Sequence, residues 1–129
     1  MEYQSALSSF SEAIRLDSSF AWAYADRGLI QYRLKQHDEC IQDCTKALSL
    51  ASPDDKDLMG ACLERRAHAY LEKGKDFADQ AIADYTDSFE YLPGIGHNYY
   101  MRAAAYRLKG GTKKSDADLI RAKKLGYTW

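Results

Sequence analysis

Three side chains that could bind a metal ion lie close together in the sequence, at His37, Cys40 and Cys44. Imidazole and thiolate are ligands that zinc prefers. On a helix, spacings of three and seven residues place these side chains on one face. Three ligands from one face cannot surround an ion tetrahedrally without a fourth from elsewhere, and free cysteine packs as a small buried hydrophobe. The sequence therefore predicts packing residues here, with no metal and no cofactor.

Other residues with catalytic chemistry do not form a recognisable set. His68 and His97 have no nearby cysteine or Ser-x-Gly sequence to supply a nucleophile. The run 109–114 contains two glycines, but it lacks the spacing of a phosphate-binding loop and the strand that precedes one. We therefore predict no catalytic residue, no small-molecule substrate and no enzymatic activity.

Arginine recurs before Gly or Ala at three places, Arg27, Arg66 and Arg102. This series could form a ladder of guanidinium groups that binds a ligand. The alternative, which we favour, is that each arginine stem packs over a neighbouring helix while its head pairs with a carboxylate such as Asp43 or Asp84.

The elements that carry these residues are predicted to be helices, because apolar residues recur with helical spacing along almost the whole chain. Gly, Pro or a capping Ser or Asp marks each break between helical stretches. Nothing resembles a strand pair with a hairpin turn. The sequence predicts an all-α fold of about seven helices, over residues 3–16, 20–34, 37–50, 57–73, 77–91, 96–109 and 113–125.

These helices repeat with a period near 34 residues. Ala13 and Ala47 are 34 residues apart, as are Ser88 and Ala122, whereas 41 residues separate Ala47 from Ser88. We assign the extra residues to the turn at 75–80 and the loop at 53–59. Such a period is typical of helical hairpins, each of which buries its apolar face only against a neighbour.

In this register the chain resembles the tetratricopeptide repeat family, whose pattern is W-x2-L-G-x2-Y, then A-x3-F, then Ala and Pro. Gln31, Cys40 and Cys44 depart from the pattern in the first full repeat. The matching positions are Tyr24, Arg27, Gly28, Gln31, Cys40, Cys44, Ala47 and Pro53, then Leu63, Arg66, Ala67, Tyr70, Ala81, Tyr85, Ser88 and Pro93, then Tyr99, Arg102, Ala103, Tyr106, Ser115, Leu119 and Ala122.

The resemblance implies a right-handed helical-hairpin solenoid that forms a single domain over residues 1–129. The opening helix matches only the second half of a repeat, at Ala6, Phe10 and Ala13. We therefore expect half a repeat at 1–18, followed by three full repeats at about 19–53, 60–93 and 96–126.

The resemblance also implies a scaffold or adaptor that binds another protein. In this family the first helix of each hairpin lines a concave groove that holds an extended peptide or a partner helix. Aromatic anchors beside a few charges, as found here, suit the centre of a specific interface. The residues expected to contact the partner are Trp22, Leu29, Tyr32, Arg33, Glu64, His68, Glu72, His97, Tyr100 and Arg107.

One subset of the family clamps a C-terminal carboxylate with Lys and Asn on these first helices. The chain lacks that clamp, because the corresponding positions hold other residues, namely Ala25, Leu29, Arg65, His97 and Met101.

Two alternatives use other surfaces. Self-assembly would use apolar residues at the two ends that expect a neighbouring helix, namely Tyr3, Phe10, Leu119 and Leu125. Nucleic-acid binding would use the basic run 109–124, since residues 102–129 carry eight basic and two acidic side chains. Few aromatic rings interleave these lysines, which disfavours the second alternative.

Composition places few other limits on function. The chain has 18 basic and 19 acidic side chains, which gives no overall charge bias toward nucleic acid or anionic lipid. Three cysteines without framework-like spacing favour a reducing compartment. No long apolar run and no signal-peptide pattern are evident, so the sequence predicts a cytoplasmic protein with no membrane contact.

Overall fold

The computed structural model describes residues 2–129, which form seven α-helices and one short 3₁₀ turn, with no strand in that range. Every helix end lies within one residue of its predicted position, so the all-α prediction is confirmed. The elements are α1 (Tyr3–Leu16), α2 (Ala21–Arg33), α3 (His37–Leu50), α4 (Lys56–Glu72), η1 (Lys75–Phe77), α5 (Ala78–Tyr91), α6 (Gly96–Leu108) and α7 (Thr112–Lys124).

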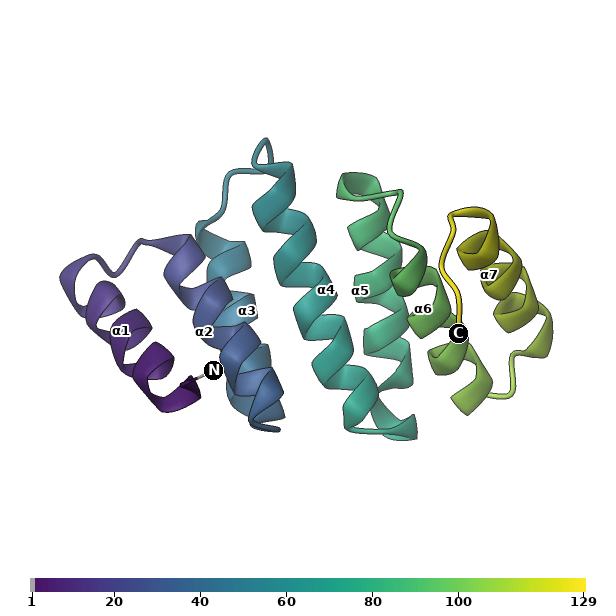
Figure 1. The fold of residues 1–129 in the computed structure, drawn as a ribbon, viewed down its shortest axis with the longest axis horizontal. Helices are drawn as coiled ribbons and strands as arrows, with labels where there is room; N and C mark the ends of the chain where they lie inside the picture. Colours follow the sequence, from purple (N-terminus) through teal and green to yellow (C-terminus); the bar gives the residue numbers. More distant parts are fainter. Residues whose placement is uncertain (1) are drawn as a thin grey trace.

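The helices follow one another in a row from α1 at one end of the molecule to α7 at the other (Figure 1). Each helix contacts the next one along the chain. In addition, α2 contacts α4 and α4 contacts α6. The molecule is therefore a helical solenoid in which α2–α3, α4–α5 and α6–α7 are successive hairpins.

A small residue lets the two helices of each hairpin approach closely. A Cβ atom added to Gly28 on α2 would lie only 3.0 Å from Cys44 Sγ and 3.5 Å from the Cys40 carbonyl oxygen of α3. Ala67 and Ala103 take the same place in the next two hairpins, and both are buried. A residue larger than alanine at this position would push the two helices apart.

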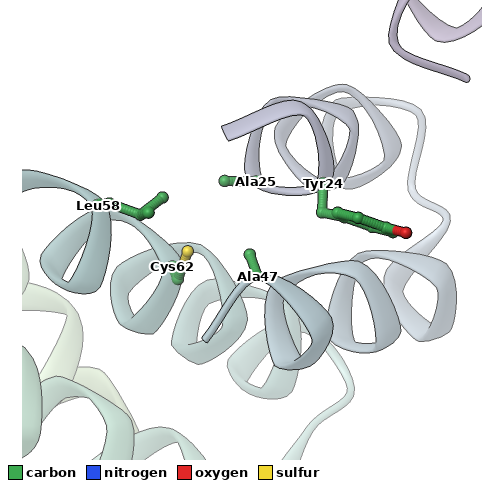
Figure 2. Packing of buried hydrophobic residues seen from close by; sticks show 5 residues of the cluster. All are labelled: Tyr24, Ala25, Ala47, Leu58 and Cys62. Carbon is green, nitrogen blue, oxygen red and sulfur yellow. The ribbon is translucent and has the colours of Figure 1, made fainter. Parts of the chain in front are cut away.

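Each hairpin buries its apolar face partly against the next hairpin. The first core cluster joins Tyr24 and Ala25 of α2 and Ala47 of α3 to Leu58 and Cys62 of α4 (Figure 2). The second cluster, Ala67, Ala81, Tyr85 and Ala105, likewise combines α4 and α5 with α6. This nearest-neighbour burial is what makes a repeat array cohesive.

The two cysteines of α3 are core residues. Cys40 and Cys44 are fully buried, and they pack with Ala69, while the half-buried Tyr32 lies against them. The Cys40 thiol beside it, together with burial, raises the pKa of Cys44 well above its usual value. The Cys44 thiol is therefore protonated and uncharged at neutral pH, as suits a side chain packed in the core.

The arginines at the repeated position pair with carboxylates, which confirms the favoured prediction. In each hairpin the Nε and Nη2 atoms of the arginine donate to the two oxygens of one aspartate on the second helix. The pairs are Arg27–Asp43 at 2.6 and 2.9 Å, Arg66–Asp84 at 2.7 and 2.8 Å, and Arg102–Asp118 at 2.8 and 2.7 Å.

The third guanidinium nitrogen of each arginine, Nη1, donates to the preceding helix. Arg66 Nη1 donates to Thr45 Oγ1 of α3 over 3.0 Å, and Arg102 Nη1 donates to Thr86 Oγ1 of α5 over 3.0 Å. Arg27 makes the same contact with Ser11 of α1 over 3.2 Å. Each guanidinium thus connects three helices of two neighbouring repeats.

Truncating a buried cysteine tests the packing assignment. Cys44→Ala should lower the free energy of unfolding by roughly 1–3 kcal/mol, because it leaves a small void against Gly28 and Ala69. Urea denaturation followed by circular dichroism measures this loss. The control is Lys46→Ala, an exposed position on the same helix, which should change stability by less than about 0.5 kcal/mol. An equally small effect of Cys44→Ala would contradict the core assignment.

Breaking one arginine–aspartate pair tests its contribution to stability. Asp84 is buried, so Arg66→Met should destabilise by about 3 kcal/mol by leaving a buried carboxylate unpaired. The double variant Arg66→Met/Asp84→Leu should lose less than the two single variants combined. The exposed pair Arg15–Glu12 on α1 is the control, and Arg15→Met should cost less than about 1 kcal/mol. Additive losses at Arg66 and Asp84 would show that the pair carries no coupling.

Candidate functional site

One side of the solenoid is built from the first helices of the three hairpins, and we call it the α2–α4–α6 face. All ten predicted partner-binding residues are on these helices. Three of them, Arg33, Glu72 and Arg107, are exposed, and the other seven are half-buried. The half-buried residues are Trp22, Leu29, Tyr32, Glu64, His68, His97 and Tyr100.

A continuous line of rings crosses this face. The Tyr32 ring of α2 lies 5.8 Å from the His68 ring of α4, which lies 5.6 Å from the His97 ring of α6. His37, at the start of α3, extends the line beyond Tyr32 at 5.6 Å. The sequence predicted that these rings share a face, and the distances show that neighbouring rings are in contact range.

A carboxylate is held beside the ring line. Asn98 Nδ2 donates to Glu64 Oε2 over 3.0 Å, and His68 Nε2 lies 3.7 Å from Glu64 Oε1. Burial alone would raise the pKa of the Glu64 carboxyl, but His68 and Asn98 together bring it below its usual value. Glu64 is therefore ionised at neutral pH and places a negative charge near the middle of the face.

The two histidines of the line differ in their surroundings. His68 Nδ1 hydrogen-bonds the hydroxyl of the fully buried Tyr85 of α5. Burial, and then the nearby His68, lowers the pKa of His97. His97 is therefore neutral at pH 7 and contributes an aromatic surface rather than a charge.

A shallow pocket lies at one edge of the face, between the end of α2 and the end of α4. Its volume is about 200 Å³, and its lining carries charges of both signs together with two rings. The lining residues are Tyr32, Arg33, Lys35, His37 and Glu72. Such a lining suits a polar or charged side chain rather than a purely apolar one.

The chain's last residues cover the opposite end of the face. Gly126, with φ of +87°, ends α7 and turns the chain back toward α6 (Figure 1). The Tyr127 ring then lies 5.2 Å from both the His97 and the Tyr100 rings. The Trp129 ring lies 5.1 Å from Tyr100. Two predicted contact residues are thus already in contact with residues 127–129.

Neither this segment nor the contact between Asn98 and Glu64 was predicted from the sequence. Asn98 is fully buried at the start of α6, and only its distance to Glu64 on another helix reveals a role. For residues 126–129, a glycine after a basic last turn was a signal for a helix stop. Two aromatic residues directly after that stop were the available hint of packing.

Several other charged side chains are already engaged. Arg65, at a clamp position, donates to the Ala25 carbonyl oxygen over 2.9 Å and lies 3.3 Å from Asp26 Oδ1. Of the basic C-terminal residues, Arg102 pairs with Asp118 and Lys109 pairs with Asp79.

The predicted self-association residues lie at the two end helices. Tyr3 and Phe10 are half-buried on α1, a helix without any buried residue in the described range. Leu119 and Leu125 are also half-buried, but they lie against α6. Leu119 borders a small cavity with Tyr100 and Arg107, and Leu125 lies beside Gly96. Ile120 is a large apolar residue of α7 that is exposed.

Within residues 2–129, no group of three His, Cys, Asp or Glu side chains is arranged to hold a metal ion. In the same range, every helix is too short or too polar to cross a lipid bilayer.

Comparison with known proteins adds sequence and structural relatives. The tetratricopeptide repeat family model matches residues 21–52, which contain α2 and α3. DnaJ homolog subfamily C member 7 from Homo sapiens is 28% identical over 116 residues, which cover 87% of this chain and 22% of that protein. The meiotically up-regulated gene 93 protein of Schizosaccharomyces pombe is 33% identical over 100 residues, covering 78% of this chain and 24% of that protein.

The chain therefore spans about a fifth to a quarter of the length of the curated relatives it matches. Among solved structures, the crystal structure of MamA protein has the same fold, with a TM-score of 0.82 and 21% sequence identity. The match covers 95% of this chain and 63% of that one. The family match falls on α2–α3, and the arginine–aspartate pair of that hairpin recurs in α4–α5 and α6–α7. Residues 21–52 therefore match a tetratricopeptide repeat, and the two following hairpins are built on the same arginine–aspartate pair.

Proposed function

We propose that the chain is a protein-binding module whose α2–α4–α6 face holds an extended peptide segment or a helix of a partner protein. The observation that carries this proposal is the line of rings from Tyr32 through His68 to His97, which crosses three helices of different repeats. Rings on rigid helices offer a large contact area at low entropic cost, which is typical of interface centres.

The charges around the ring line support a partner of mixed charge. Glu64 and Glu72 are on α4, whereas Arg33 and Arg107 are at the ends of α2 and α6. The arginines and Glu72 are exposed and free to meet a partner, while Glu64 is held in place by Asn98. Opposite charges at separate points of one face fix the register and direction of a bound segment.

Alanine substitutions on the face test this proposal. Peptides would first be selected from a random displayed library against the unchanged chain, and their affinities measured by fluorescence anisotropy. Trp22→Ala, Tyr100→Ala and Arg107→Ala should each weaken binding by about 1–2 kcal/mol or more, because large rings and arginine dominate interface energies. Circular dichroism would check that each variant is folded.

The control for these variants is Lys46→Ala, since Lys46 is exposed on α3, outside the face. It should leave the affinity unchanged. If none of the three face variants weakens binding, the partner site lies elsewhere on the solenoid.

Self-association through the solenoid ends is the second candidate. Helix α1 supports this candidate. It is amphipathic and packs against α2, yet none of its residues in the described range is buried. Burying such a face against another copy would stabilise both. The excess of basic residues in 102–129 over an otherwise acidic chain favours head-to-tail contact.

A charge placed on α1 tests the second candidate. Light scattering at high micromolar concentration should show a dimer or larger assembly, and Phe10→Asp should dissociate it because the carboxylate would have to be desolvated at the interface. Glu12→Gln, an exposed change on the same helix, is the control and should leave the assembly intact. A strict monomer at that concentration would rule out self-association of this chain.

A further inference from the structure

The contacts of residues 126–129 suggest which kind of segment the α2–α4–α6 face accepts. We propose that residues 127–129 are a resident ligand of the α6 end of the face, and that a partner segment with two aromatic side chains separated by one residue binds there by displacing them. The inference rests on the proposed function of the face, and it names the class of partner.

The rings of His97 and Tyr100 form the surface that residues 127–129 contact, and we call this surface the seat. The Tyr127 ring lies 5.2 Å from both His97 and Tyr100, and the Trp129 ring lies 5.1 Å from Tyr100. Thr128, between the two rings, is exposed. Tyr127 and Trp129, with one residue between them, both lie within contact range of the Tyr100 ring. The spacing of aromatic, any residue, aromatic is therefore the one that presents two rings to this seat.

The ring of Tyr127 is not required by the repeat itself. In the preceding hairpin Leu92 packs against Gly60, and a Cβ atom on that glycine would lie 2.3 Å from the leucine side chain. Tyr127 takes the equivalent place, 2.8 Å from where a Cβ atom of Gly96 would lie. An aliphatic side chain therefore satisfies the packing at this place, and the ring adds a contact with the face.

The segment is held weakly enough to exchange. Its backbone makes one hydrogen bond beyond Gly126, from Tyr127 N to the Ala122 carbonyl oxygen over 3.1 Å. Within residues 2–129 no hydrogen bond holds Thr128 or Trp129, and Trp129 remains 63% exposed. Displacing Tyr127, Thr128 and Trp129 thus breaks at most this one backbone hydrogen bond, together with ring contacts that an incoming pair of rings would restore.

The seat also continues into the rest of the face. His97 contacts Tyr127 on one side and His68 on the other, and His68 contacts Tyr32. A partner segment that replaces Tyr127 could therefore run on along the ring line toward α2, which residues 126–129 leave uncovered. Tethering gives the resident segment an effective concentration on the order of millimolar, so it competes strongly with a free peptide.

A synthetic peptide with the sequence of residues 125–129 tests the proposal. It would carry a fluorophore at its amino end and be titrated with the unchanged chain and with the variant Tyr127→Leu/Trp129→Ser. The leucine keeps the aliphatic contact seen at Leu92, and circular dichroism would confirm the fold. Because the variant lacks its competing rings, it should bind the peptide at least about tenfold more tightly than the unchanged chain.

Two matched controls define the seat. Adding Tyr100→Ala to the variant should abolish the gain in affinity, and a peptide with serine in place of both aromatic residues should bind neither protein. Equal affinity of the unchanged chain and the variant, or no binding by the variant, would overturn the proposal.

The outcome also separates this inference from the proposed function. If library-selected peptides lose affinity on Trp22→Ala, yet bind the unchanged chain and the tail variant equally, the face is a binding site and the resident-ligand proposal is wrong. If those peptides are insensitive to Trp22→Ala, Tyr100→Ala and Arg107→Ala, while the tail peptide still prefers the variant, the seat holds residues 126–129 but the wider face is not the partner site.

Discussion

In every hairpin, a bidentate ion pair between an arginine of the first helix and an aspartate of the second fixes how the two helices pack. Asp43, Asp84 and Asp118 are buried, and a buried carboxylate is tolerated only with its partner in place. Because the third guanidinium donor reaches a hydroxyl of the preceding helix, the same side chain also sets the register between repeats. On α4, Arg66 and His68 are two residues apart, so they point to opposite sides of the helix. Because Arg66 is held against Asp84 of α5, His68 and the line of rings face the other side of α4.

The sequence predicted the parts of the structure that depend on period and residue type. Helix ends followed from Gly, Pro and capping residues, and the pairing of Arg66 with Asp84 followed from the recurrence of both in register. The Glu64–Asn98 contact was not predictable, because these residues are 34 positions apart in the sequence and meet only through the packing of α4 against α6. The path of residues 127–129 was also missed, since a segment without periodicity carries no signal of the surface it meets.

Departures from the family pattern are concentrated in the first hairpin. Gln31 stands where a ring is usual, it is buried, and its Oε1 atom has no hydrogen-bond partner in the described part of the chain. Cys40 and Cys44 fill the space opposite Gly28 with small thiols. The preceding α1 adds no buried side chain. Since each repeat is stabilised by its neighbours, local opening should begin at α1 and α2 rather than at α4–α5, where Tyr85 fills the core.

The opposite end of the solenoid combines a firm contact with a loose one. Tyr127 meets Gly96 at a place that an apolar residue must fill, whereas its ring and that of Trp129 meet the face only through other rings. Side chains without hydrogen bonds, in a segment outside regular secondary structure, open at low free energy. The backbone turn at Gly126 can therefore stay in place while the rings beyond it exchange. As proposed above, a face built on rigid helices and covered at one end by such a segment would select partners by the rings they offer in place of Tyr127 and Trp129.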